Sequence, residues 1–163
     1  MPQTAITEIG RAELPRVRAL AFAIWPEAYA GILPAENIAP MLEDIYALET
    51  LAADIEERGH RYWIATADGA DAGFVSAYRE SERVWIKKIY VLASARGLSL
   101  GKRLIDTAVA AFPGTQSVVL LVNNGNAKAI GFYKAQGFAV EAAVPVRMGG
   151  FDYTDYRMAK PLF

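Results

Sequence analysis

The sequence of 163 residues contains no cysteine and a single histidine, His60. Without cysteine there is no disulfide framework, no thiolate metal site and no cysteine nucleophile. One histidine also excludes a histidine-rich metal site. Because His60 stands in the stretch EERGHRYW, at the junction between an expected helix and an expected strand, we predict that it is an exposed turn residue.

The sequence also lacks an excess of charge of either sign and a long apolar run. Lys and Arg number 17 against 18 Asp and Glu, a net charge of −1, so no basic field points to nucleic acid or to an anionic membrane. No apolar segment approaches the ~20 residues that cross a bilayer. The first residues, MPQTAITEIG, lack the basic and apolar regions of a secretory signal. We expect a soluble, cytoplasmic protein.

What the sequence does contain predicts one globular domain over residues 1–163. Hydrophobic residues make up 53% and charged residues 21%, which argues against disorder. Apolar patterns predict helices at residues 12–25, 35–58, 100–112 and 123–138, with Pro40 splitting or kinking the second. Strands are expected at residues 4–9, 61–67, 72–79, 83–92 and 116–122, with two more in the tail. The order β-α-α-β-β-β-α-β-α-β-β predicts an α/β domain, a mixed sheet with helices on its faces.

The stretch ARGLSLGKRL, residues 95–104, joins an expected strand to an expected helix. Free amide groups at a helix N-terminus favour anions, and Arg96, Lys102 and Arg103 add positive charge. A Walker loop is excluded because three residues rather than four separate Gly97 from Gly101, and the Rossmann spacing is absent. An ordinary glycine-containing turn with solvated basic residues remains the alternative.

This loop resembles the pyrophosphate loop, [Q/R]-x-x-G-x-[G/A], of the GCN5-related N-acetyltransferase (GNAT) superfamily. The matching residues are Arg96, Gly97, Leu98, Ser99, Leu100 and Gly101. The surrounding IYVLASARGLSLGKRLIDTA is similar to the family's acetyl-CoA segment, and NAKAIGFYKAQGF resembles its signature N-x-x-A-x-x-F-Y-x-x-x-G-F. YAGILPAE and the tail are similar to polyamine-type and other small-amine members. The resemblance implies a mostly antiparallel sheet with helices on both faces, and often a homodimer.

One residue departs from the family pattern: Ser99 stands at the central glycine. If this position needs a positive φ, a residue other than glycine costs about 1–2 kcal/mol. A serine is small enough to fit beside a phosphate, and its hydroxyl could cap the helix or donate to an oxygen. We therefore still expect acetyl-CoA to be the acyl donor.

The resemblance also assigns the rest of the donor site. It places the pantetheine arm along the strand before the loop, against the backbone of Ile89, Tyr90 and Val91. It adds Lys102 to the residues of the pyrophosphate loop. These residues act mainly through backbone amides and carbonyls, and the alternative for their side chains is plain core packing.

The second motif adds Asn126, Ala129, Phe132 and Tyr133 to the donor site. Asn126, Ala129 or Ile130, and Tyr133 are spaced so that they share one helical face. A polar residue, a small residue and a phenol on one stripe could line the bound donor. A tyrosine at this spacing is otherwise typical of core packing.

Tyr133 is the predicted general acid of an acetyl transfer in which an amine attacks acetyl-CoA directly, without a covalent enzyme intermediate. A phenol of ordinary pKa ~10 is protonated at neutral pH and can protonate the leaving sulfur. Family members often carry a glutamate as base on the strand before the loop, but that position is Trp85 here. Glu80 and Glu82 could act only through water, so no base is assigned.

The acceptor pocket is expected between the first helical region and the later strands. Tyr29, Trp85 and Tyr153 could form aromatic walls that suit a cationic amine. Several acidic residues could balance its charge, and the sequence does not choose among them: Glu36, Glu43, Asp44, Asp152 and Asp155.

The predicted function is an N-acetyltransferase acting on a small amine, a polyamine or a peptide amine. The alternative is a non-catalytic acyl-CoA-binding or regulatory domain of the same fold. Ser99 and the missing strand glutamate favour this alternative, whereas the intact face from Asn126 to Tyr133 disfavours it.

Overall fold

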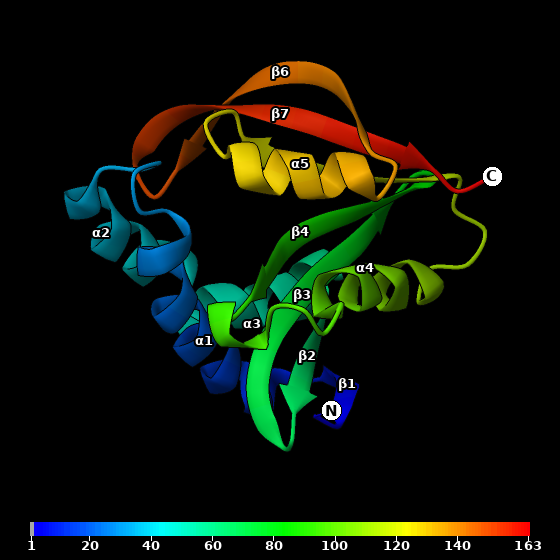
Figure 1. Cartoon of the computed structure of the whole chain (residues 1–163), viewed down its shortest axis with the longest axis horizontal. Helices are drawn as coiled ribbons and strands as arrows, with labels where there is room; N and C mark the ends of the chain where they lie inside the picture. Colours follow the sequence, from blue (N-terminus) through cyan, green and yellow to red (C-terminus); the bar gives the residue numbers. More distant parts are fainter. Residues whose placement is uncertain (1) are drawn as a thin grey trace.

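A seven-stranded sheet organises the chain, in the order β1-β2-β3-β4-β5-β7-β6 (Figure 1). The computed structural model describes residues 2–163. Only β4 and β5 run parallel, and every other neighbouring pair is antiparallel. The strands are β1 (Thr4–Ile9), β2 (Arg61–Ala67), β3 (Ala70–Glu80), β4 (Arg83–Val91), β5 (Ser117–Asn123), β6 (Ala139–Met148) and β7 (Phe151–Pro161). The predicted α/β fold class is confirmed.

Helices cover both faces of the sheet (Figure 1). They are α1 (Leu14–Ala28), α2 (Ala35–Ile45), α3 (Leu48–Arg58), α4 (Leu100–Ala110) and α5 (Ala127–Ala135). One hydrophobic cluster lies between the sheet and α1, α2 and α3, and a second lies under α4 and α5. Within residues 2–163, no helix combines the length and apolar character needed to cross a membrane.

The second helical region differs from its prediction in where it breaks. Pro40 lies inside α2, and the chain leaves the helical conformation at Tyr46 and Ala47, where Ala47 has φ −56° and ψ 135°. The ring of Tyr46 is fully buried, 5.7 Å from the Trp25 ring and 6.0 Å from the Phe74 ring. Packing of this ring against the sheet therefore sets the break, which the local sequence does not reveal.

The parallel strands β4 and β5 part after a short common segment. Residues 83–86 of β4 pair with residues 117–120 of β5, and the pairing ends there. Beyond this point β4 keeps only β3 as a partner and β5 keeps only β7. The facing edges of both strands are then without ladder partners, and exposed edge groups of this kind can bind an extended ligand.

A bulge in β4 changes which face of the sheet its side chains reach. Ala77 pairs with Ile86 and Ser76 pairs with Lys88, so Lys87 is an extra residue. Ile86 belongs to the cluster under α4, whereas the Lys88 ammonium lies 5.7 Å from the Tyr46 ring on the opposite face. Because one extra residue inverts the alternation, the bulge moves Lys88 to the face covered by α1, α2 and α3.

The tip of the hairpin formed by β6 and β7 packs on α2. Gly149 has φ +59°, and a Cβ atom there would lie 2.8 Å from the Met41 Cα, so only glycine fits this contact. Nearby, the Asn37 side chain donates to the Tyr153 hydroxyl at 3.2 Å. These contacts hold the hairpin beside the point where β4 and β5 part.

Candidate functional site

A cavity of about 1000 Å³ opens where β4 and β5 separate. Residues from β3, β4, β5, β6, β7, α5, the start of α4 and the loop before it line the cavity, together with residues near the ends of α1 and α2 and residues of α3. Of the predicted site residues, the cavity brings together Tyr29, Trp85, Ile89, Tyr90, Val91, Arg96, Gly97, Ser99, Leu100, Gly101, Lys102, Asn126, Ala129, Phe132 and Tyr133.

Two predicted site residues do not line this cavity. The side chain of Leu98 packs against the hydrophobic cluster under α4. The hydroxyl of Tyr153 accepts a hydrogen bond from Asn37 and donates to the Met41 sulfur at 3.7 Å. Tyr153 therefore fastens the β7 strand to α2 instead of forming a wall of the pocket.

The loop before α4 presents a run of unbonded backbone amides. The first backbone hydrogen bond of the helix runs from the Arg103 amide to the Ser99 carbonyl, at 3.1 Å. Among the described residues, the amides of residues 97–102 donate to no backbone or side-chain acceptor. Gly97 at φ +89° and Ser99 at φ +57° set this conformation. Amides at a helix N-terminus form a site for phosphate oxygens.

Ser99 adopts a left-handed conformation, with φ 57° and ψ 26°, so the position does need a positive φ. Its hydroxyl makes no capping hydrogen bond to α4. The serine therefore bears the conformational cost of the position without the compensation that a cap would give.

The basic residues of the loop do not all face the cavity. Arg96 and Lys102 line it, and the Lys102 ammonium lies 2.8 Å from the Asp106 carboxylate one turn along the helix. Arg103 instead donates to the hydroxyl of Thr4. The positive charge at the loop is thus smaller than the sequence alone indicates.

The second sequence motif lies directly against this loop. A Cβ atom on Gly101 would stand 3.1 Å from the Phe132 ring, so the missing side chain allows α5 to approach. Asn126 begins α5, and its side-chain oxygen accepts a hydrogen bond from the Ala129 amide at 3.2 Å. The two motifs therefore form one continuous wall of the cavity.

The strand before the loop offers its backbone rather than its side chains. Residues 89–91 of β4 pair with β3 along one edge, and no strand within residues 2–163 pairs with the other edge. The Tyr90 ring packs 5.7 Å from Phe74 and 5.8 Å from Trp25, and its hydroxyl forms a 2.8 Å hydrogen bond with that of Tyr29. This edge is a place where an extended chain can add alongside β4.

The phenol of Tyr133 is nearly buried, with 9% of the residue exposed, at the wall of the cavity. Burial raises the pKa of Tyr133, and the neighbouring Tyr29 raises it further. Burial also raises the pKa of Tyr29 to about 12, although its hydrogen bond with Tyr90 opposes the shift. Both phenols are therefore protonated at neutral pH and available as donors.

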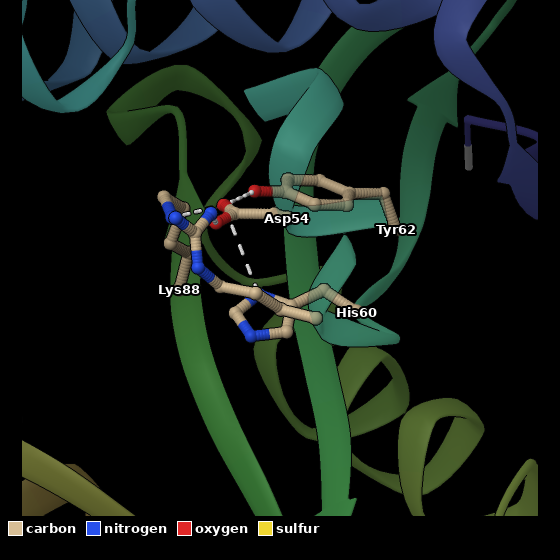
Figure 2. Close-up of polar contacts among 5 residues, drawn as sticks. Asp54, His60, Tyr62 and Lys88 are labelled. Carbon is tan, nitrogen blue, oxygen red and sulfur yellow. Dashed lines mark hydrogen bonds and ion pairs between the residues drawn. The ribbon is translucent and has the colours of Figure 1, made fainter. Parts of the chain in front are cut away.

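A buried ionic network, which the sequence analysis missed, borders the same cavity (Figure 2). Asp54 of α3 accepts hydrogen bonds from Tyr62 at 2.8 Å, from Lys88 at 3.3 Å and from Arg58 at 3.1 Å. Burial alone would raise the pKa of Asp54, but the Lys88 charge and the Tyr62 hydroxyl outweigh it and the pKa is lowered. The Asp54 carboxylate is therefore ionised, and three side chains of the protein donate hydrogen bonds to it.

The expectation that His60 is an exposed turn residue is wrong. His60 is 6% exposed and stacks on Tyr78, with ring centroids 4.5 Å apart and planes 7° from parallel. Its Nδ1 lies 3.7 Å from the Asp54 carboxylate, yet burial lowers the pKa of His60 to about 4 and the ring is neutral at pH 7. His60 directly precedes β2, whose residues 62–65 are all buried, and this continuous apolar run was the available signal that the segment enters the core.

Asp155 is a second buried carboxylate at the cavity, on β7. Its Oδ1 atom has no hydrogen-bond partner among the described residues. Burial raises the pKa of Asp155, and the charge of Lys87 only partly offsets this. Within residues 2–163, no group of three or more histidine, aspartate and glutamate side chains is placed to hold a metal ion.

Comparison with known proteins identifies relatives of the whole chain. Residues 19–138 match the model of the acetyltransferase (GNAT) family. A probable N-acetyltransferase of Mycobacterium tuberculosis is 25% identical over 91% of this chain and 91% of its own length. The solved PaiA N-acetyltransferase of Thermoplasma acidophilum, in complex with coenzyme A, superimposes with a TM-score of 0.83 at 22% identity. That likeness covers 98% of this chain and 99% of the other.

Proposed function

The chain belongs to the acetyltransferase (GNAT) family, and from this premise we propose that it transfers the acetyl group of acetyl-CoA to a primary amine. The acceptor class is a small amine, a polyamine or a peptide amine. The observation that carries the proposal is one cavity in which the free loop amides, the unpaired edge of β4 and the phenol of Tyr133 meet. The coenzyme A bound to the Thermoplasma acidophilum relative supports the choice of donor.

The donor would lie along residues of three elements. The amides of residues 97–102 would hold the pyrophosphate, with Arg96 beside them. The free edge of β4 at residues 89–91 would pair with the amides of the pantetheine arm. Phe132 and Ala129 of α5 would close the other side, which brings the thioester toward Tyr133.

The reaction is a direct attack by the neutral amine nitrogen on the thioester carbonyl carbon. A carbon–nitrogen bond forms, the carbon–sulfur bond breaks, and the leaving sulfur takes a proton from the Tyr133 hydroxyl. The surplus proton of the attacking nitrogen then restores the phenol. Because burial keeps this phenol protonated, it can act as the acid throughout the neutral pH range.

An acceptor screen tests this function. The protein is incubated with acetyl-CoA and a panel of small amines, polyamines and peptides, and the acetylated product is detected by mass. Released coenzyme A can be followed with a thiol reagent, because the chain has no cysteine of its own to react. Turnover with at least one amine is expected. A thermal shift with acetyl-CoA but no acetylated product from any amine would support the non-catalytic alternative.

The role of Tyr133 is tested by Tyr133→Phe, which removes only the hydroxyl. We expect turnover to fall by more than about tenfold, since positioned acids contribute at least this much. Acetyl-CoA should still raise the melting temperature of the variant as it does for the natural protein. Near-normal turnover would remove Tyr133 from the mechanism.

A further inference from the structure

Asp155 is a buried carboxylate that takes no part in the reaction described above. On β7 it pairs with Asn123 of β5 and Val144 of β6, and 9% of the residue is exposed. Its Oδ1 atom is sealed from solvent and lacks a hydrogen-bond partner among the described residues. A carboxylate in such surroundings is costly unless another group supplies the opposite charge. Since Asp155 lines the cavity, a ligand in the cavity can supply the opposite charge by approaching the part of the residue that stays accessible, without contact to the sealed Oδ1 atom.

The carboxylate lies near the groups assigned to the chemistry. Asp155, Tyr29 and Tyr133 all line the cavity. The charge of Asp155 contributes to the raised pKa of Tyr29, and Tyr29 in turn contributes to the raised pKa of Tyr133. An acceptor that meets a thioester beside Tyr133 would therefore occupy the same cavity as Asp155.

The other acidic residues are less suited to meet an acceptor. Asp54 is already bonded to its own partners, and Asp44 is an exposed residue at the cavity rim. Asp152 lies three residues before Asp155 on β7, but its side chain is 80% exposed and 3.0 Å from Arg147. Asp152 does not line the cavity. Asp155 alone among these carboxylates is buried, free of a partner and in the cavity.

The charged groups around Asp155 leave room for a cation. Lys87 of β4 lowers the pKa of Asp155 through its charge but forms no ion pair with it. Arg157, on the same strand, forms an ion pair with the carboxylate of Glu141 at 2.9 Å. Lys128 of α5 lines the cavity as well. Burial nonetheless keeps the pKa of Asp155 raised, so these cations do not neutralise it.

We propose that Asp155 receives the ammonium group of the acceptor and takes a proton from its nitrogen, an inference that rests on the acetyl transfer proposed above. The acceptor is accordingly a cationic amine whose ammonium group enters the cavity first. One nitrogen proton passes to the carboxylate, and the freed electron pair attacks the carbonyl carbon. As the carbon–sulfur bond breaks, sulfur takes the Tyr133 proton, and a second nitrogen proton restores the phenol. Asp155 then releases its proton to solvent.

The first experiment compares Asp155→Asn with Asp152→Asn, a matched change on the same strand outside the cavity. With the best amine of the screen, kcat/KM is measured from pH 5 to pH 10. Asp155→Asn should lower kcat/KM by about 100-fold or more, the scale of a positioned base. Asp152→Asn should stay within about twofold, and both variants should bind acetyl-CoA normally. Formate should restore part of the activity of Asp155→Ala, whereas chloride should not. Normal kcat/KM for Asp155→Asn would overturn the proposal.

A second experiment needs no turnover. The titration of the Asp155 carboxyl is followed by carbon NMR, assigned by difference from Asp155→Asn, with and without propylammonium or propan-1-ol. Propylammonium should move this titration to lower pH because a cation favours the carboxylate, and the neutral alcohol should not. No response to propylammonium would overturn the role of Asp155. If no amine is acetylated, the proposed function fails, while this titration still decides whether Asp155 binds an ammonium group.

Discussion

Asp54 and Asp155 are two carboxylates of nearly equal burial, 6% and 9% exposed, at the wall of one cavity. Asp54 is bonded to Tyr62, Lys88 and Arg58, and its pKa is lowered. Asp155 makes none of these contacts, and its pKa is raised. Burial is therefore not what separates them. The side chains that the fold places around a buried carboxylate decide whether it is paired within the protein or is available to bind a ligand.

The two residues should consequently respond to pH in opposite directions. A lowered pKa means that Asp54 stabilises the fold above pH 3.8 and that this stability is lost as pH falls further. A raised pKa means that ionised Asp155 opposes folding at neutral pH. That cost disappears as pH falls through its folded pKa toward 3.8.

The largest predicted effect is that of Asp54→Asn. The amide leaves the ammonium of Lys88 buried without its counter-charge, which typically costs about 3–5 kcal/mol. Urea unfolding at pH 7 measures the loss. Adding Lys88→Met should recover part of it, because the double variant no longer contains an unpaired buried charge. A loss below about 1 kcal/mol would mean that the network is not the strong ion pair that its geometry indicates.

The next effect is the pH dependence that His60 gives to the free energy of unfolding. The folded pKa of about 4 lies below the ordinary 6.5, so the unfolded chain takes up a proton first as pH falls. The free energy of unfolding should be constant above pH 6.5 and should decline between pH 6.5 and 4. His60→Gln should flatten that decline, while Asp155→Asn should make it steeper, because the variant lacks the carboxyl whose destabilising charge is lost as pH falls. An equally steep decline in His60→Gln would show that His60 does not titrate as described.

The difference between the carboxylates also explains what the sequence could predict. The loop before α4 and the motif from Asn126 to Tyr133 are each contiguous, and their amides, caps and turns depend on neighbouring residues. Motifs of this kind can be compared with a family pattern, and the residues named in this way line the cavity, with the exception of Leu98. A positive φ at Ser99 was considered as a condition for the same reason, and the structure has it.

The two buried carboxylates at the cavity come from distant segments, and the register of the strands sets their surroundings. Asp54 meets Lys88 across 34 residues, and only because the bulge at Lys87 inverts the alternation of β4. The position of Asp155 between β5 and β6 is fixed by its strand pairing with both Asn123 and Val144. No pattern within either strand reveals which acidic residue will find a partner, so the sequence offered Asp155 as one of several acids.

The third effect is the stability of Asp155→Asn, which should have the opposite sign to Asp54→Asn. Removing an unpaired buried charge should raise the free energy of unfolding at pH 7 by about 1 kcal/mol. The gain should shrink as the pH falls through the folded pKa toward 3.8, because the natural carboxyl of the folded state is then protonated and no longer carries a buried charge. Urea unfolding at pH 7 and pH 4 measures both values. A loss of stability would indicate that Asp155 has a structural partner after all, and would erase the contrast with Asp54.

The smallest effect concerns Ser99→Gly, in the loop before α4. Glycine relieves a left-handed strain of about 1–2 kcal/mol but adds about 0.5–1 kcal/mol of unfolded-state entropy. A net gain of about 0.5 kcal/mol in the free energy of unfolding is expected. Ser81→Gly is the matched control, since Ser81 has the same φ of 57° in the turn between β3 and β4, outside the cavity. Affinity for acetyl-CoA should stay within about twofold in both variants, because the natural loop already holds the conformation that glycine would allow. A large gain in affinity confined to Ser99→Gly would show instead that the serine weakens the donor side.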